Sequence, residues 1–411
     1  MSENIILAIL VFYPFIGALA AYVIGTKKET WRDLFADFIT VSEFIMVLAL
    51  FIANWNKLYA DVFSVYDCSI PGVCGMGLNF TLESFRLLYI LIAAFMWMMT
   101  TIISREYMQH HDNKNRFYLF MLATLGATMG VFLAADLYTM FIFFEIMSFT
   151  SYVWVAQEES AAALKAAATY LAVAVIGGLV MLMGIFLLYH VLGTVKISEL
   201  FFAALLYEGD HRLIYVAGVC LLVGFGAKAG AFPLHIWLPK AHPVAPAPAS
   251  ALLSGILTKV GVFGILITSC DLFLDNVVWG QLILTVGVLT MFGGALLAVF
   301  SMDLKHTLAC SSMSQIGFIL VGIGMQEFIG GKSLMAVHGT LLHMVNHSLI
   351  KLVLFMAAGV VFMNTHALNL NEIRGFGRKK PLLKVVFLIG ALAIGGIPMF
   401  SGYISKTLLH E

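Results

Sequence analysis

Long apolar stretches recur along the whole chain and restrict its fold more than any other feature. About twelve of them alternate with short polar segments, and about 20 predominantly apolar residues form a helix that crosses the hydrocarbon core of a bilayer. Of the 411 residues, 61% are hydrophobic and only 11% are charged, which is not the composition of a soluble domain. We therefore predict an all-α, polytopic membrane protein.

The apolar stretches also place the helices. The first follows a single charged residue, Glu3, without the basic segment or small-residue cleavage pattern of a signal peptide, so we interpret it as a retained span. Prolines within two later stretches predict that those two helices are interrupted. The predicted helices cover residues 4–25, 34–53, 84–104, 117–135, 137–156, 166–190, 213–240 (interrupted), 249–269, 276–300, 307–326, 334–363 and 382–411 (interrupted).

Basic residues gather in alternate loops, which predicts the orientation of the chain. The segments on the opposite side, 54–82 and 270–275, carry aspartates and a single lysine. By the positive-inside rule the basic loops face the cytoplasm and the N-terminus lies outside. The loops that follow the first, third and eleventh helices contain Lys27, Lys28, Arg32, Arg105, Lys114, Arg116, Arg374, Arg378, Lys379 and Lys380.

Charged residues inside the apolar stretches are the strongest functional signal. Lys228 and Lys259 each lie within such a stretch. A lysine near the middle of a span costs about 2.5–3.5 kcal/mol on insertion scales, so it usually faces a protein interior or a water cavity. Pro233 and the neighbouring His235 follow Lys228, and the backbone groups that a break there would free must be satisfied by protein or water. A broken helix beside a buried lysine predicts an ion route.

Glu145 is an isolated acid in the stretch FFEIMSF. It could tether two helices through a hydrogen bond, or it could be a protonatable site. Burial disfavours the charged forms of both an acid and an amine, whereas proximity stabilises both as ions. We predict that Glu145 and Lys228 are partners whose protonation states are coupled.

The eleventh stretch, LLHMVNHSLIKLVLF, carries a stripe of titratable groups. His343, His347 and Lys351 are spaced by four residues and therefore lie on one helical face, and His338 lies about one turn nearer the outer end. Histidine titrates near neutral pH, so the stripe is typical of a proton relay. Histidines four residues apart could instead bind a metal or a haem, or be satisfied core residues.

Paired interrupted helices indicate an internal repeat. Phe232-Pro233 followed by Lys240 resembles Ile397-Pro398 followed by Lys406, and such pairs are typical of inverted-repeat transporters. The chain stops soon after the second break, which leaves open a longer natural protein. We find no Rossmann, Walker, CxxC or Ser-His-Asp pattern, and a net charge of zero gives no indication of nucleic-acid binding. Cys68 and Cys74 share one loop and could form a disulfide if that loop faces an oxidising compartment, and their spacing matches no metal-binding run.

Four segments together resemble the antiporter-like subunits of respiratory complex I, of Mrp cation/proton antiporters and of energy-converting hydrogenases and formate hydrogenlyases. They are FFEIMSF, GAKAGAFPLHIWLPKAHPVAPAPASALLSGILTKVG, HMVNHSLIKLVLFMAAG and GIPMFSGYISK. The resemblance implies fourteen helices with two inverted five-helix repeats, each with a broken helix. It divides the chain into a three-helix segment (1–110), a first repeat (111–270) and an incomplete second repeat (271–411).

The resemblance also implies roles for individual residues. It implies that protons pass through Glu145, Lys228, Lys259, His343, His347 and Lys406, with His235 beside the broken helix. The residue pattern itself adds Lys351 to this path and adds Pro233, His338 and Pro398 as possible gating or relay positions. The resemblance implies no cofactor and no metal in this chain, whereas iron-sulfur clusters, flavin, a nickel-iron site or quinone could lie in partner subunits. The partners would be other membrane subunits, homologous ones included, in the inner membrane of a prokaryotic cell.

Several functions stay open at the level of the sequence. We expect a proton-translocating subunit of a complex I-like or energy-converting hydrogenase-like oxidoreductase, and the segment WLPKAH, where complex I subunits commonly have WLPDAH, favours the hydrogenase branch. Protons are favoured over Na⁺, since sodium would need clustered oxygen ligands. The alternatives are a subunit of an Mrp-type Na⁺/H⁺ antiporter, a haem- or quinone-binding redox protein, a scaffold whose charges only lock helices, and a self-contained solute carrier.

Overall fold

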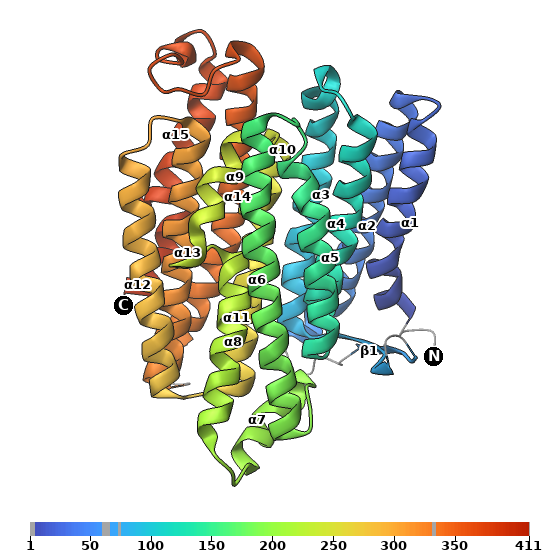
Figure 1. Cartoon of the computed structure of the whole chain (residues 1–411). Coiled ribbons are helices and arrows are strands. Elements are labelled where there is room, and N and C mark those ends of the chain that lie inside the picture. The colour runs from blue at the N-terminus through green and yellow to red at the C-terminus, as the bar shows by residue number, and fades with distance from the viewer. Residues whose placement is uncertain (1–4, 60–65, 73–74, 331–333, 411) are drawn as a thin grey trace.

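The chain folds into a bundle of long, roughly parallel and antiparallel helices (Figure 1). The structure is a computed structural model, which describes residues 5–59, 66–72, 75–330 and 334–410. The helices are α1 (Ile5–Gly25), α2 (Glu29–Tyr59), α3 (Ser84–Tyr107), α4 (Lys114–Leu133), α5 (Leu137–Val155), α6 (Ala161–Leu192), α7 (Ile197–Leu206), α8 (His211–Ala229), α9 (Leu238–Val244), α10 (Ala247–Leu252), α11 (Thr258–Leu272), α12 (Val277–Val299), α13 (Leu304–Ile329), α14 (Leu334–Thr365), α15 (Pro381–Gly395) and α16 (Ser401–His410).

The predicted spans and the observed helices agree closely. Among the described residues, eleven helical segments are long and apolar enough to cross a membrane. The segment His211–Val244 contains the break after α8, and the twelfth predicted span is divided into α15 and α16. The prediction of an all-α membrane protein with two interrupted helices is confirmed.

Two small elements were not predicted. The helix α7 has ten residues, and strands β1 (Tyr66–Ile70) and β2 (Leu78–Leu82) form an antiparallel hairpin with Tyr66 opposite Leu82. The hairpin is held by tertiary contacts, since the Asn79 amide donates to Asp136 Oδ2 over 3.0 Å at the start of α5. A contact between residues so far apart in the sequence cannot be predicted from a local sequence pattern. The pairing of Cys68 with Cys74 stays untested because Cys74 lies outside the described residues.

The core of the bundle is the segment from α10 to α11, in which every residue from 247 to 269 is buried. A π-helical turn (Leu253–Leu257) joins the two helices, and π-turns inside helices often mark functional sites. Figure 1 shows α11 behind α6 and α8, with α12 at one flank and α1 at the other. The helix with Lys259 therefore has protein on all sides.

Small residues let α12 and α13 approach closely. Gly280, Gly287 and Gly294 recur every seven residues on α12 and face the backbone of α13. A Cβ added at Gly287 would lie 2.8 Å from the Val321 nitrogen, whereas one at Gly293 would meet only the end of the Met313 side chain at 3.6 Å. Close approach at small residues is the usual packing of helices in bilayers.

Gly287→Ala is expected to lower the stability of the protein by about 1–3 kcal/mol, because the added methyl group forces α12 away from α13. Gly293→Ala adds the same methyl group where there is space, so its effect should be close to zero or slightly stabilising. Thermal unfolding of both variants in detergent, followed by size-exclusion chromatography, measures the difference. Equal melting temperatures would show that the close approach of these helices does not limit stability.

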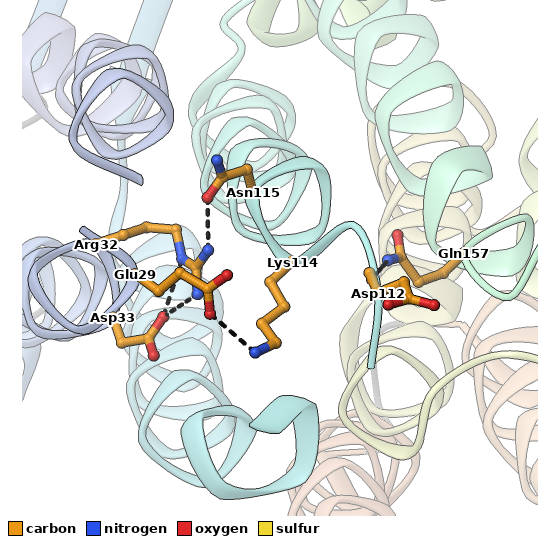
Figure 2. A network of polar contacts seen from close by, with 7 residues as sticks. All are labelled: Glu29, Arg32, Asp33, Asp112, Lys114, Asn115 and Gln157. Atoms are coloured by element: carbon orange, nitrogen blue, oxygen red, sulfur yellow. Dashed lines mark hydrogen bonds and ion pairs between the residues drawn. The ribbon is translucent and has the colours of Figure 1, made fainter. Parts of the chain in front are cut away.

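The basic loops predicted to be cytoplasmic lie together at one end of the bundle, at the top of Figure 1. At this end Arg32 of α2 is 1% exposed, donates from Nη1 to Asn115 Oδ1 of α4 over 2.5 Å and pairs with Asp33. Figure 2 shows this network beside the ion pair of Lys114 with Glu29, whose atoms are 2.9 Å apart. The network joins α2 to α4 and borders a cavity of about 630 Å³.

Candidate functional site

The predicted relay residues form two polar clusters inside the bundle. Five of them are buried, namely Lys228, Lys259, His343, His347 and Lys351, and two are half-buried, namely Glu145 and Lys406. They come from α5, α8, α11, α14 and α16. The cluster around Lys228 lies on α5, α6 and α8, whereas the cluster around Lys259 lies on α11, α13, α14 and α16, so we describe the two separately.

The first cluster surrounds Lys228, near the end of α8. Its Nζ donates to the Tyr170 hydroxyl of α6 over 2.6 Å and to the Ser148 hydroxyl of α5 over 3.1 Å. Ser151 and Tyr170 exchange a further hydrogen bond of 2.6 Å. Lys228 also lies over the face of the Tyr170 ring, 5.0 Å from its centroid. Hydroxyl groups from two neighbouring helices therefore solvate this buried amine.

The expected contact between Glu145 and Lys228 is not a direct ion pair in this structure. Glu145 precedes Ser148 by one helical turn, and its Oε1 is buried without a hydrogen-bond partner. Gly178 of α6 faces this carboxylate, where a side chain would collide with it. The lysine instead bonds Ser148 and Tyr170. The two charged groups interact electrostatically without a direct bond, because the crossing of α5, α6 and α8 places hydroxyls around the amine, and the coupling of their protonation states stays a prediction.

The second cluster begins at Lys259, which is 1% exposed. Its Nζ donates over 2.7 Å to the Ser254 carbonyl in the π-helical turn, and the Thr258 hydroxyl donates to the same oxygen over 2.8 Å. The side chains thus satisfy a carbonyl that the π-turn leaves accessible. The Ser254 and Ser312 hydroxyls are 2.6 Å apart and connect this turn to α13.

Lys351 of α14 is anchored on the same part of α13. Its Nζ donates to the Leu308 carbonyl over 2.8 Å and to the Ser311 hydroxyl over 2.5 Å. Ser312 donates to the same carbonyl over 2.9 Å. The two buried amines, Lys259 and Lys351, are therefore connected through Ser254, Ser312 and one peptide group.

His343 and His347 continue from Lys351 along α14, as predicted. Their rings are nearly parallel, with centroids 6.4 Å apart. His343 has Nε2 at 3.1 Å from Gln315 Oε1 and Nδ1 at 3.0 Å from the Ser405 hydroxyl. Neither ring nitrogen of the buried His347 has a hydrogen-bond partner. Both nitrogens of His343 are engaged by side chains, which favours a relay over metal ligation.

Lys406 lies beside Ser405 at the far end of this cluster. Its Nζ donates to the Ile394 carbonyl over 2.8 Å and lies 4.8 Å from the centroid of the Phe318 ring. The exposed His338 is on the surface of α14, whereas His343 is buried. The structure therefore does not bring His338 into the buried stripe.

Both helix breaks expose backbone groups that side chains then satisfy. After α8, Gly230 adopts a φ of 76° and Trp237 Nε1 donates to the Ala227 carbonyl over 2.7 Å. After α15, Gly396 adopts a φ of 78°, and Lys406 bonds a carbonyl of the preceding turn. A positive φ is costly for residues with a side chain. Pro233 and Pro398 follow these glycines, so the two breaks are built alike.

His235 follows the first break and is half-buried. Its ring stacks on Phe232 with 5.8 Å between centroids, and its Nδ1 has no hydrogen-bond partner. It is thus available beside the break, as the prediction requires.

Further buried charged and polar groups were missed, among them Lys305, His242 and Glu43. Lys305 is 2% exposed, and its Nζ donates to the Ala245 carbonyl over 2.8 Å. His242 is fully buried, stacks on Phe355 with 4.8 Å between centroids, and has no partner for either ring nitrogen. Glu43 is a fully buried acid whose two carboxylate oxygens lack partners. Lys305 lay just before its predicted span and His242 in a predicted loop, whereas Glu43 could have been found as an acid inside a span.

No group of three or more His, Cys, Asp or Glu side chains that could hold a metal ion occurs in the described ranges. The chemistry available in the two clusters is therefore that of amines, imidazoles, hydroxyls and one carboxylate. Such groups can hold and exchange protons in a water-poor interior.

Comparison with known proteins agrees with this arrangement. A family model described as NADH:quinone oxidoreductase/Mrp antiporter, TM, matches residues 134–410. The chain is 30% identical over 416 residues to a protein named as antiporter subunit mnhD2 in Staphylococcus aureus (strain JH9), and the match covers 100% of this chain and 80% of that protein.

Two solved structures share the fold. One is the membrane-bound sulfane sulfur reductase, an archaeal respiratory membrane complex, with a TM-score of 0.87, 23% identity and coverage of 98% of this chain and 81% of that chain. The other is the Mrp complex from Dietzia sp. DQ12-45-1b, with a TM-score of 0.86, 24% identity and coverage of 100% and 74%. The family match and the full-length relative together show that this chain belongs to the NADH:quinone oxidoreductase/Mrp antiporter family of antiporter-like membrane subunits.

Proposed function

We propose that the chain translocates protons across the membrane as one subunit of a multisubunit complex. The row of buried groups from Lys259 through Lys351, His347 and His343 to Lys406 supports this most strongly. Each of these groups except His347 is held by a hydrogen bond to a neighbouring helix, a helix break or the π-helical turn, so the row is part of the architecture. If the charged residues only locked the helices together, a buried histidine whose ring nitrogens have no hydrogen-bond partner, such as His347, would have no purpose.

The physical basis is the low dielectric of the bundle interior. Two buried amines that are close to each other cannot both be charged without a large cost. A proton that arrives at Lys259 therefore changes the preferred state of Lys351, and the effect passes on to the histidines. A conformational or electrostatic change in a partner subunit could drive the cycle through Glu145 and Lys228. We propose that redox chemistry in partner subunits, with cofactors such as iron-sulfur clusters, provides this drive.

An Mrp-type Na⁺/H⁺ antiporter without redox chemistry is the second candidate. It is favoured by the 30% full-length identity to a protein named as an antiporter subunit. The site itself favours protons as the ion carried by this chain, since its polar groups are amines and imidazoles and lack the clustered oxygens of a sodium site. In either assembly we place the chain in the inner membrane of a prokaryotic cell, with the basic loops in the cytoplasm.

Inverted membrane vesicles that contain the assembled complex distinguish the two assemblies. A redox complex is expected to acidify the vesicle interior when an electron donor is supplied, whether or not Na⁺ is present. An antiporter is expected to collapse an imposed pH gradient when Na⁺ is added and to ignore the donor. Vesicles that show neither response, although the complex is intact on a blue-native gel, would contradict proton translocation.

A further inference from the structure

A cavity at the outer end of the bundle is not used by the relay described above. This end lies opposite the basic loops, where α3 begins and α11 ends. The cavity has a volume of about 300 Å³. Its polar lining consists of Glu83, which directly precedes α3, and of Cys270, Asp271, Gln326 and Thr340 from α11, α13 and α14.

Two side chains at this cavity have a polar atom without a protein partner: Thr340, which lines it, and Arg86, whose Nε donates to the lining residue Glu83. Thr340 is 1% exposed, and its hydroxyl has no hydrogen-bond partner. Arg86 is fully buried and bonds the Phe132 and Ala134 carbonyls through Nη1, but its Nη2 has no partner. Leaving such a group unsatisfied costs about 1–3 kcal/mol. Water in the cavity would satisfy the Thr340 hydroxyl, which is part of its lining.

A second, smaller void lies next to Lys259. Its volume is about 10 Å³, which is close to the space that one water molecule needs. Lys259 lines it, together with Tyr89 of α3 and Met344 of α14. Leu341 lines both the small void and the larger outer cavity, so this one side chain lies between them.

The separation between the two spaces is apolar. The Tyr89 hydroxyl donates to the Met344 sulfur over 2.8 Å. The Tyr89 ring packs against Phe85, which also lines the outer cavity, with 5.0 Å between centroids. Such a constriction stops ions when dry and conducts when it is wetted.

We propose that the outer cavity is the exit for protons that leave Lys259 directly, and that Leu341 is its gate. The inference rests on the proposed function and adds a route to it. This route runs between α3 and α14, whereas the row through His343 contacts Gln315 of α13 and Ser405 of α16. Protons on Lys259 thus have a short path to the outer surface that does not pass through Lys406.

The test fills the gate with a larger apolar side chain. Leu341→Trp is expected to lower ion transport in vesicles about tenfold or more, because the bulky ring closes the constriction. The matched control is Leu342→Trp, since Leu342 is the next residue and is 43% exposed on the outside of the bundle. Its transport should stay within about twofold of the wild type. An assembled Leu341→Trp complex with wild-type transport would overturn the proposal.

A second measurement decides the matter if Leu341→Trp prevents assembly. Val337→Cys places a thiol in the cavity lining, in a chain whose native cysteines are replaced by serine or alanine. A cationic, membrane-impermeant thiol reagent added to the outer side should label this thiol and block transport. The control is Phe328→Cys, which is exposed near the same end and should be labelled without loss. Absence of labelling at 337, or labelling without loss of transport, would refute the exit.

Separate variants test the proposed function and the proposed exit. If Lys259→Ala leaves transport intact, the proposed function of the chain is wrong and the exit is wrong with it. If Lys259→Ala abolishes transport while Leu341→Trp and labelled Val337→Cys transport normally, only the exit is wrong.

Discussion

Replacing Lys259 by alanine is expected to lower proton transport by the assembled complex about tenfold or more. The side chain is 1% exposed and lies in the segment 247–269, in which every residue is buried, so no exposed side chain of this segment can take over its role. Its Nζ also holds the Ser254 carbonyl, next to the hydroxyl that contacts Ser312. Loss of the amine removes both the proton carrier and the link to Lys351.

The control for this variant is Lys240→Ala. Lys240 lies in the same stretch of sequence but is exposed, so its loss should leave transport unchanged. Lys259→Arg adds a sharper distinction, since arginine keeps the charge but does not release its proton at neutral pH. If Lys259 is part of a proton relay, Lys259→Arg should be inactive. If Lys259 only provides a structural charge, arginine should replace it and transport should be retained. Blue-native gels confirm assembly, and proton uptake by inverted vesicles measures the rates.

Replacing Lys228 by alanine is expected to have an effect of similar size, again about tenfold or more. The amine is 3% exposed and is the donor to both Tyr170 and Ser148. Without it, the Glu145 carboxyl loses the buried cation with which it interacts electrostatically. We expect the complex to assemble, because Tyr170 and Ser151 still bond each other.

Two companion variants test this expectation. Lys165→Ala removes an exposed lysine of α6 and should transport like the wild type. Tyr170→Phe removes only the hydroxyl that solvates Lys228, so the pH profile of transport should change shape while the complex stays intact. Wild-type transport by Lys228→Ala would exclude the first cluster from the path. An unchanged pH profile in Tyr170→Phe would limit the tyrosine to packing.

Much of the fold could be predicted because a bilayer imposes a local requirement. Every span must satisfy its own backbone and present apolar side chains to lipid, so residues 84–107 or 277–299 are recognisable one stretch at a time. The breaks at Pro233 and Pro398 are local as well. The hairpin β1–β2 and helix α7 escaped prediction because contacts with distant residues hold the hairpin and because α7 is too short to span.

The residues of the site likewise fall into those that the sequence predicts and those whose burial depends on packing. The types and spacing of Lys228, Lys259, His343, His347 and Lys351 are visible in the sequence, since a charge inside an apolar stretch is costly wherever it lies. Lys305 and His242 were missed because their burial depends on how α9 and α13 pack. Glu43 was missed although it is an acid inside a predicted span and could have been recognised by the same criterion.

The order of amino acids was sufficient to establish a multispanning helical protein, its breaks and its buried charges, because hydrophobicity and proline act over a few residues. Which groups contact each other was decided only by the packing of the helices. That packing put Ser148 and Tyr170, instead of Glu145, against Lys228. It also joined Lys259 to Lys351 through Ser254 and Ser312, and placed Leu341 between Lys259 and an outer cavity. Hydrogen bonds act over about 3 Å, so only the folded bundle can select their partners.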